Sequence, residues 1–341
     1  SPVPAGLSAQ AWQFFALFVT VISALILEPI PTAAIGLMGV TFGAALIMVP
    51  GTPGTAGTPS DGLRFALGGF SNGTVWLIFT AYMFSLGYEK TGLGKRIALL
   101  LIKALGKRTL GLGYAVALAD LAVAPFTPSN TARSGGIIFP IIKNIPPLYG
   151  STPEDGRQRI GSYVMWTAMA TTCVTSSMFL TGLAPNLLAL EILNKTAKIT
   201  ISWTEWFVAL APACILLFLL VPWLVYVLYP PTVKESADAP KWAHEELVRM
   251  GAVSAKELTM GGLALLALLL WIFGGKKFDA TTVALIGLCL MIVTRVITWD
   301  EVIGHKTAWN VLVWFATLVA MADGLAKVGF LSWFAKTAAA S

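Results

Sequence analysis

Residues 124–136 read Ala-Pro-Phe-Thr-Pro-Ser-Asn-Thr-Ala-Arg-Ser-Gly-Gly, and they lie in the middle of a mostly apolar segment, 109–142. The prolines and glycines of this stretch interrupt any helix that the apolar residues would form. The same segment carries Asp120 and Arg133, two charges that are unusual in apolar surroundings. A segment that is apolar, charged and broken at once decides how the rest of the chain is interpreted.

The composition of the whole chain indicates an integral membrane protein. Of its 341 residues, 56% are hydrophobic and 12% are charged, which is about half the charged share of an ordinary soluble domain. The net charge of +6 fits basic loops beside anionic lipid, and the 12 Trp residues fit the headgroup level of a bilayer. This composition excludes cytoplasmic enzymes, disordered proteins and nucleic-acid-binding modules, so no nucleic-acid partner is expected.

Apolar stretches long enough to cross a bilayer predict the membrane spans. The loop 87–109 carries six basic residues against one acid, which places it on the cytoplasmic side. Its leucines and isoleucines recur at helical spacing, so an interfacial helix is expected there. The expected spans are 10–28, 31–49, 66–88, 161–193, 205–229, 259–274, 280–297 and 308–324, with a Gly/Pro/Thr-rich turn region from Pro50 to Pro59.

The segment 109–142 is expected to form a re-entrant helical hairpin. Lys143, Arg157 and Arg159 make the loop after it basic, so both of its flanks lie on the cytoplasmic side. A chain that enters and returns on one side needs a tip within the membrane, here near 125–131. Irregular backbone at that depth must be buried in protein or line a watery cavity. Two ordinary short spans are the alternative.

Two pairs of segments indicate an internal repeat. Residues 33–37 resemble 284–288, and residues 80–98 resemble 317–335, in the same order along the chain. With 87–109 on the cytoplasmic side, the matched spans run in opposite directions, as in the inverted repeats of secondary transporters. The hairpin tip should recur near position 366, beyond the last residue, so we expect the sequence to be truncated.

The hairpin tip offers groups that suit a carboxylate. Ser129 is placed to cap the outgoing helix, whose N-terminus offers free N–H groups and the positive end of the helix dipole. Asn130 and Thr131 add neutral donors, although a capped turn without a ligand is the alternative. Arg133 follows within one turn, and it could neutralise a substrate carboxylate or pair with Asp120. The sequence leaves that choice open.

A second break is predicted within 161–193, where several Ser and Thr residues precede Thr-Gly-Leu-Ala-Pro-Asn, 181–186. Gly182 and Pro185 should leave two half-helices with free backbone groups between them, and Asn186 follows directly. Together with the hairpin tip, this break would form a site near the bilayer midplane. A simple proline kink with Ser and Thr packing is the alternative.

No pattern in the sequence indicates an enzyme, a metal site or a cofactor. The chain has no nucleotide-binding glycine-rich loop and no paired carboxylates beside a cleft. His244 and His305 lie in charged loops without ligand spacing. Cys173, Cys214 and Cys289 lie in apolar runs and are interpreted as packing residues.

Four strings resemble the divalent anion/sodium symporter family, most closely its exchanger branch, and the resemblance covers essentially the whole chain. It implies two inverted repeats, each with a re-entrant hairpin and a broken helix, in a homodimer of the bacterial inner membrane that works by an elevator-type movement. The substrates it implies are small carboxylate anions, with succinate exchanged against citrate, tartrate, malate or oxoglutarate. Binding roles are implied for Ser129, Asn130, Thr131, Gly182, Pro185 and Asn186. The strings are Gly-Tyr-Glu-Lys-Thr-Gly-Leu-Gly-Lys-Arg-Ile-Ala (87–98), Ala-Pro-Phe-Thr-Pro-Ser-Asn-Thr-Ala-Arg (124–133), Ala-Pro-Asn (184–186) and Ala-Trp-Asn (308–310).

Two departures from the sodium-coupled members of that family favour sodium-independent exchange. Pro125 stands where those members place a serine ligand, and Leu183 and Ala184 stand where they have small hydroxylated residues or proline. The fixed charge of Arg133 would resist reorientation without a bound dianion, which would make exchange obligatory. A Na⁺-coupled dicarboxylate symporter is the runner-up. A membrane enzyme acting on lipid or isoprenoid, and a scaffold that does not transport, are further alternatives.

The expected fold class is therefore an all-α integral membrane protein, an inverted-repeat secondary transporter whose second repeat is incomplete. We expect scaffold helices and the interfacial helix of the first repeat over 1–108. The transport domain follows over 109–204, and then a span with a cytoplasmic loop over 205–258. The scaffold helices of the second repeat occupy 259–341.

Overall fold

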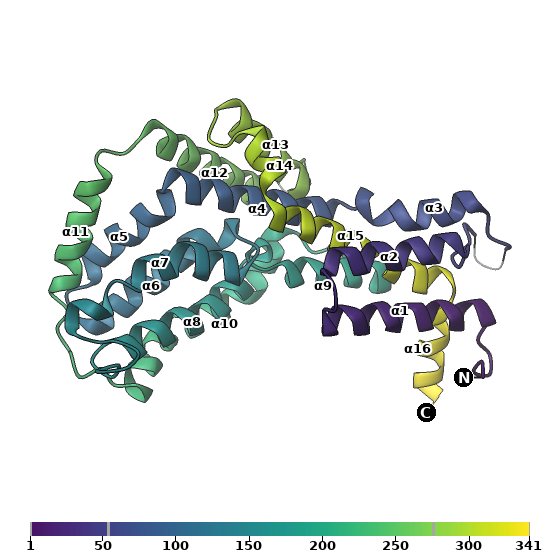
Figure 1. Cartoon of the computed structure of the whole chain (residues 1–341), viewed down its shortest axis with the longest axis horizontal. Helices are drawn as coiled ribbons and strands as arrows, with labels where there is room; N and C mark the ends of the chain where they lie inside the picture. Colours follow the sequence, from purple (N-terminus) through teal and green to yellow (C-terminus); the bar gives the residue numbers. More distant parts are fainter. Residues whose placement is uncertain (1, 53–54, 275–276, 341) are drawn as a thin grey trace. The chain divides into compact units, whose positions relative to one another are not determined.

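The computed structural model describes residues 2–52, 55–274 and 277–340, and every regular element in this part of the chain is helical (Figure 1). Five of these helices are long and apolar enough to cross a membrane, which confirms the expected all-α membrane class. They are α1 (Ala9–Leu27), α6 with the turn after it (Thr109–Phe126), α10 (Trp203–Leu228), α12 (Ala255–Phe273) and α15 (Lys306–Lys327).

The helices form two compact units, one made of residues up to Phe79 together with those from Ile303 onward, and the other of Thr80–Val302. In the first unit, α1 and α15 pack with α2 (Thr32–Ala45), α3 (Pro59–Gly68) and α16 (Phe330–Ala340). Its core is mostly aliphatic, with the aromatic residues Phe14, Phe65 and Phe330 among the buried side chains, and Phe15 stacks on Phe330 with ring centroids 4.1 Å apart. Within the expected turn region, residues 53–54 lie outside the described residues.

A glycine lets two segments of this unit approach closely. Gly69 lies directly after α3, and a β-carbon at this position would collide with the backbone carbonyl of Ala316 in α15. At neighbouring Gly68, by contrast, a β-carbon would meet no atom within 4 Å. The contact between the end of α3 and α15 therefore depends on one missing side chain.

The second unit holds the segment that decides the fold. Here α6 (Thr109–Val123) and α10 both pack along α8 (Gly161–Met178), and the three helices lie side by side (Figure 1). The second unit also contains α5 (Leu93–Leu105), α7 (Phe139–Ile142), α9 (Ala184–Ala197), α11 (Asp238–Met250), α12 and α13 (Ala280–Val293), while α4 (Gly73–Thr91) and α14 (Trp299–Gly304) each have residues in both units.

The expected span 66–88 is wrong as one continuous helix. The chain leaves α3 through a short turn, Gly69–Ser71, and α4 begins after Asn72. The side chain of Asn72 explains the restart, since its Oδ1 accepts the backbone N–H of Thr74 at 2.8 Å and so satisfies a donor that the helix start leaves free.

The expected cytoplasmic loop within 205–258 contains a helix, α11, that the sequence analysis missed. Its polar residues hid it from a search for apolar spans, but they pair with α5, a helix that is present at 93–105, where the sequence predicts one. Lys95 Nζ lies 3.0 Å from Glu246 Oε2, and Lys103 Nζ lies 3.1 Å from His244 Nδ1. His244 therefore lies on a helix and not in a loop.

The two glycines that the repeat aligns adopt the same unusual backbone conformation. Gly92 has φ +76° between α4 and α5, and Gly329 has φ +84° between α15 and α16. Positive φ is easily reached only by glycine, which explains why both positions need that residue. The matched segments 80–98 and 317–335 thus share the same order of helix, left-handed glycine and helix.

Candidate functional site

The segment 109–142 contains two helical arms joined by an irregular tip. Helix α6 ends at Val123, a short turn covers Ala124–Phe126, and the chain is extended at Thr127 (φ −130°, ψ 100°). The return arm begins as a wide π-helical segment, η3 (Thr131–Ile138), which continues into α7. Wide turns of this kind occur often at functional sites.

Ser129 caps the return arm through both its side chain and its backbone. Its Oγ accepts the N–H of Ala132 at 3.3 Å, and its carbonyl accepts the N–H of Arg133 at 2.9 Å. The Ser129 side chain also hydrogen-bonds Tyr82 of α4. The tip is therefore ordered by local hydrogen bonds in the way that the capping pattern predicts.

The second predicted break lies between α8 and α9. Helix α8 ends at Met178, a turn covers Leu180–Gly182, and α9 starts at Ala184 with Pro185 in its first turn. Asn186 satisfies carbonyl groups that the break leaves free, because its Nδ2 donates to the carbonyl oxygens of Ser176 at 2.8 Å and Phe179 at 3.1 Å. Asn186 thus closes the end of α8.

The tip and the break lie against each other. The N–H of Ala184 donates to the carbonyl oxygen of Pro128 at 2.9 Å, and the hydroxyl of Thr181 donates to that of Pro125 at 2.5 Å. Two irregular segments that the sequence keeps about 55 residues apart therefore share hydrogen bonds at one place. Each segment therefore satisfies hydrogen-bonding groups of the other that have no partner within their own helix.

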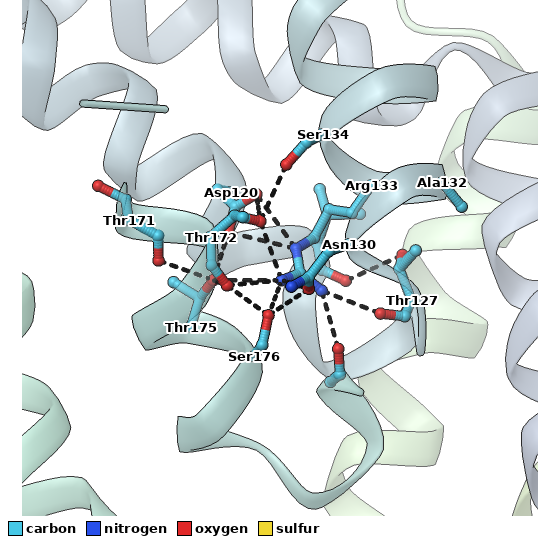
Figure 2. A network of polar contacts seen from close by, with 12 residues as sticks. Asp120, Thr127, Asn130, Ala132, Arg133, Ser134, Thr171, Thr172, Thr175 and Ser176 are labelled. Carbon is cyan, nitrogen blue, oxygen red and sulfur yellow. Dashed lines mark hydrogen bonds and ion pairs between the residues drawn. The ribbon is translucent and has the colours of Figure 1, made fainter. Parts of the chain in front are cut away.

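Arg133 is the centre of this junction, and its side chain is completely buried. Its Nε lies 3.1 and 3.2 Å from the two carboxylate oxygens of Asp120, and its Nη1 donates at 3.0 Å to the carbonyl oxygens of both Thr127 and Gly182 (Figure 2). The remaining nitrogen, Nη2, lies within hydrogen-bond distance of Asn130 Oδ1, the carbonyl and Oγ1 of Thr172, Thr175 Oγ1 and Ser176 Oγ, and its two hydrogens are shared among these acceptors.

The charge of Arg133 is compensated inside the protein. Asp120 is also buried, and besides the guanidinium it accepts the hydroxyls of Thr172 at 3.1 Å and of Thr175. Buried charges persist when they are paired and their remaining polar atoms are hydrogen-bonded, and both conditions hold here. Of the two roles that the sequence left open, the structure shows Arg133 paired with Asp120.

Asn130 is held so that its amide nitrogen stays available. Its Oδ1 accepts from Arg133 Nη2 at 3.1 Å and from the hydroxyl of Ser176, while its Nδ2 donates to no residue in the described part of the chain. Asn130, Thr131, Ser134 and Thr172 are the polar lining residues of a cavity of about 380 Å³ between the return arm and α8, and the other residues that line it are apolar or glycine. Thr131 is exposed, whereas Asn130 and Ser134 are half-buried.

The residues that the sequence singled out separate into two groups. Asn130 and Thr131 face the cavity, with Ser129 directly before them, whereas Gly182 and Asn186 bind the backbone and side chains of the junction. Pro185 is exposed in the first turn of α9. The sequence analysis missed the specific partners of the ion pair. Their spacing on one face of a helix is a signal that could have grouped them. They are Thr172, Thr175 and Ser176.

Comparison with known proteins gives one family and several close relatives. The family model for the sodium:sulfate symporter transmembrane region matches residues 1–341. The chain is 49% identical over 351 aligned residues to the L-tartrate/succinate antiporters of Escherichia coli (strain K12) and Shigella flexneri. Each alignment covers 100% of this chain and 71% of the relative.

Proposed function

This chain belongs to the sodium:sulfate symporter family, and from that premise we propose that it exchanges di- and tricarboxylates across the membrane. It is a multi-span membrane transporter, homologous to bacterial antiporters, and not an enzyme. The relatives' names give tartrate and succinate as their substrates. For this chain we propose succinate as one substrate, exchanged against a second small carboxylate such as tartrate, citrate, malate or oxoglutarate.

The observation that carries the proposal is the orientation of Asn130. Because Arg133 and Ser176 occupy its carbonyl oxygen, the side chain presents its NH₂ group as a donor. Thr131, which is exposed and lines the same cavity, follows at the start of the return arm. Neutral donors at a helix N-terminus suit a carboxylate, which accepts several hydrogen bonds at once.

Sodium independence is supported by what the guanidinium of Arg133 binds. The carbonyl oxygens of Thr127 and Gly182, one from the tip and one from the break, both accept from its Nη1. Backbone carbonyls at interrupted helices are the kind of ligand that transporters offer to Na⁺. Here a permanent cation occupies them, and Pro125 offers no side-chain oxygen. Since Asp120 neutralises that cation, an uncompensated charge on Arg133 is not available as the reason for obligatory exchange.

The proposed mechanism uses an inverted repeat and an elevator-type movement of the hairpin with the broken helix. The glycines at 92 and 329, both at positive φ between matched helices, support the repeat. The hydrogen bonds of Arg133 support movement of tip and break as one body, since they join α6, the tip, α8 and the loop at Gly182. We also propose that the protein forms a homodimer, and this part of the proposal depends on the family resemblance alone.

Transport into vesicles tests the proposal. The complete gene product is reconstituted in Na⁺-free buffer, with one set of proteoliposomes preloaded with unlabelled succinate and the other left empty. Uptake of labelled succinate into the preloaded set only is the expected result and identifies an antiporter. Uptake into empty vesicles that requires added Na⁺ would instead identify the runner-up, a Na⁺-coupled dicarboxylate symporter.

A further inference from the structure

A groove on the second unit lies beside the end of the return arm, and it shares Phe139 and Met165 with the cavity that Asn130 lines. It has a volume of about 520 Å³ and runs from α7 and the loop after it to the first turns of α8. The proposed substrate site uses none of its polar residues. The residues on which the argument depends are Phe139, Lys143, Arg157, Ser162 and Trp166.

One end of the groove is basic. Lys143 and Arg157 both line it and both are exposed, and neither side chain has an ion-pair partner within the described part of the chain. Ser162 lines the same groove, whereas the hydroxyl of Thr152 already donates to the carbonyl oxygen of Asp155 at 3.2 Å. Two cations with a neighbouring serine match a phosphate group, whose oxygens accept from both kinds of donor.

The other wall of the groove is apolar and uncovered. Phe139 is 49% exposed and Trp166 is 41% exposed, although both are large hydrophobic side chains. Trp166 stacks on Tyr229 at the end of α10, with ring centroids 5.4 Å apart and an angle of 14° between the rings. Stacked Trp and Tyr side chains at helix ends are typical of the boundary between lipid and water.

The expected depth of the groove in the membrane agrees with this combination of basic residues and interfacial aromatic side chains. Its basic residues belong to the loop 143–160, which the distribution of Lys and Arg places on the cytoplasmic side, and α8 enters the membrane from there. The cytoplasmic leaflet carries anionic lipids, and basic pockets between helices on that side bind their headgroups. The acidic residues of the loop, Glu154 and Asp155, are not among those that line the groove.

We propose that this groove binds one anionic phospholipid of the cytoplasmic leaflet, with its phosphate on Lys143 and Arg157 and an acyl chain along Phe139 and Trp166. The combination of charges and an adjoining apolar wall favours a lipid over a free phosphate, which would gain nothing from the wall. The lipid would hold the return arm of the hairpin to α8 at the membrane surface, on the side away from the tip.

Native mass spectrometry of the purified protein tests the proposal directly. Phosphatidylglycerol is titrated into the detergent-solubilised protein. The amount of this lipid that the protein retains is compared with the amount of phosphatidylcholine of the same chain length. The double variant Lys143→Gln, Arg157→Gln should bind phosphatidylglycerol roughly thirty-fold more weakly, because two charges near the headgroup are lost. Phe139→Gln should also weaken retention of phosphatidylglycerol. Glycerol phosphate, added as a competitor for Lys143 and Arg157, should compete with the lipid as well in this variant as in the wild type.

A matched control removes two other charges from the same unit. In the double variant Lys241→Gln, Arg249→Gln, both replaced side chains are more than 70% exposed on α11, and phosphatidylglycerol binding should stay as in the wild type. Three results would overturn the proposal. They are equal retention by the Lys143/Arg157 variant, equal retention of phosphatidylcholine by the wild type, and complete displacement of the lipid by glycerol phosphate.

Discussion

The guanidinium of Arg133 lies against the carboxylate of Asp120, with Nε 3.1 Å from Oδ1 and 3.2 Å from Oδ2, and both side chains are buried. Each residue then reaches a different part of the junction. Asp120 belongs to the entering arm of the hairpin, while Arg133 extends from the return arm to the broken helix. One ion pair therefore connects three segments that the backbone alone would leave independent.

Removing one partner of this pair should destabilise the protein strongly. Asp120→Ala leaves the guanidinium buried without its counter-charge, a change that costs about 3–5 kcal/mol in comparable sites. We expect a large drop in the midpoint of thermal unfolding in detergent, with loss of exchange as a consequence. The double variant Asp120→Leu, Arg133→Met removes both charges and should recover much of the lost stability.

An exposed pair provides the control for that experiment. Asp238 and Lys241 form an ion pair on α11 with Nζ 3.3 Å from Oδ1, and both side chains are more than half exposed. Asp238→Ala should change stability by less than about 1 kcal/mol, because water and salt screen such pairs. If Asp120→Ala unfolded no earlier than Asp238→Ala, the pair would have no structural role.

Asn130 should be essential for exchange but not for folding. In Asn130→Ala the tip loses the NH₂ donor that binds no described residue, while Arg133 keeps Asp120 and the carbonyl oxygens of Thr127 and Gly182. Labelled succinate exchange should fall to background, with the amount of protein in the membrane unchanged. Asn144→Ala is a suitable control, since that amide only binds the carbonyl groups of Pro140 and Ile141 in its own arm. Normal exchange by Asn130→Ala would exclude the tip from the substrate site.

The sequence predicts the backbone of the site better than its electrostatics. Breaks at the tip and at Gly182 are visible because proline and glycine act locally, and so is the cap at Ser129. The sequence names Asp120 as one possible partner of Arg133, but it cannot decide between Asp120 and a substrate carboxylate, because that choice depends on how the helices pack. Helix α11 was missed for a related reason. Its charged residues are typical of a loop, and only their contacts with α5 show that they belong to a packed helix.

Gly69 gives a prediction for the first unit. Gly69→Ala would place a methyl group on the backbone carbonyl of Ala316, which can move only with α15. Overpacking of this kind typically costs about 1–3 kcal/mol, so the unfolding midpoint should fall. Gly68→Ala should leave the midpoint unchanged or raise it slightly, because nothing lies within 4 Å of the added carbon. Equal effects of the two substitutions would show that α3 and α15 do not pack in this way.

Glu246 gives a prediction for the pH dependence of the contact between α11 and α5. Hydrogen bonds from Lys95 and Arg249 hold the pKa of the Glu246 carboxyl below its ordinary value of 4.5. A carboxyl whose pKa is lower in the folded state stabilises the fold above its unfolded pKa, and this contribution is lost as the pH falls through the folded value. Unfolding midpoints should therefore decline below about pH 4.5, and less steeply in Glu246→Gln than in the wild type.

The control is Glu245→Gln, on the exposed side of the same helix, whose unfolding midpoint should decline as that of the wild type does. Parallel curves for wild type and Glu246→Gln would show that the ion pair with Lys95 contributes nothing to stability.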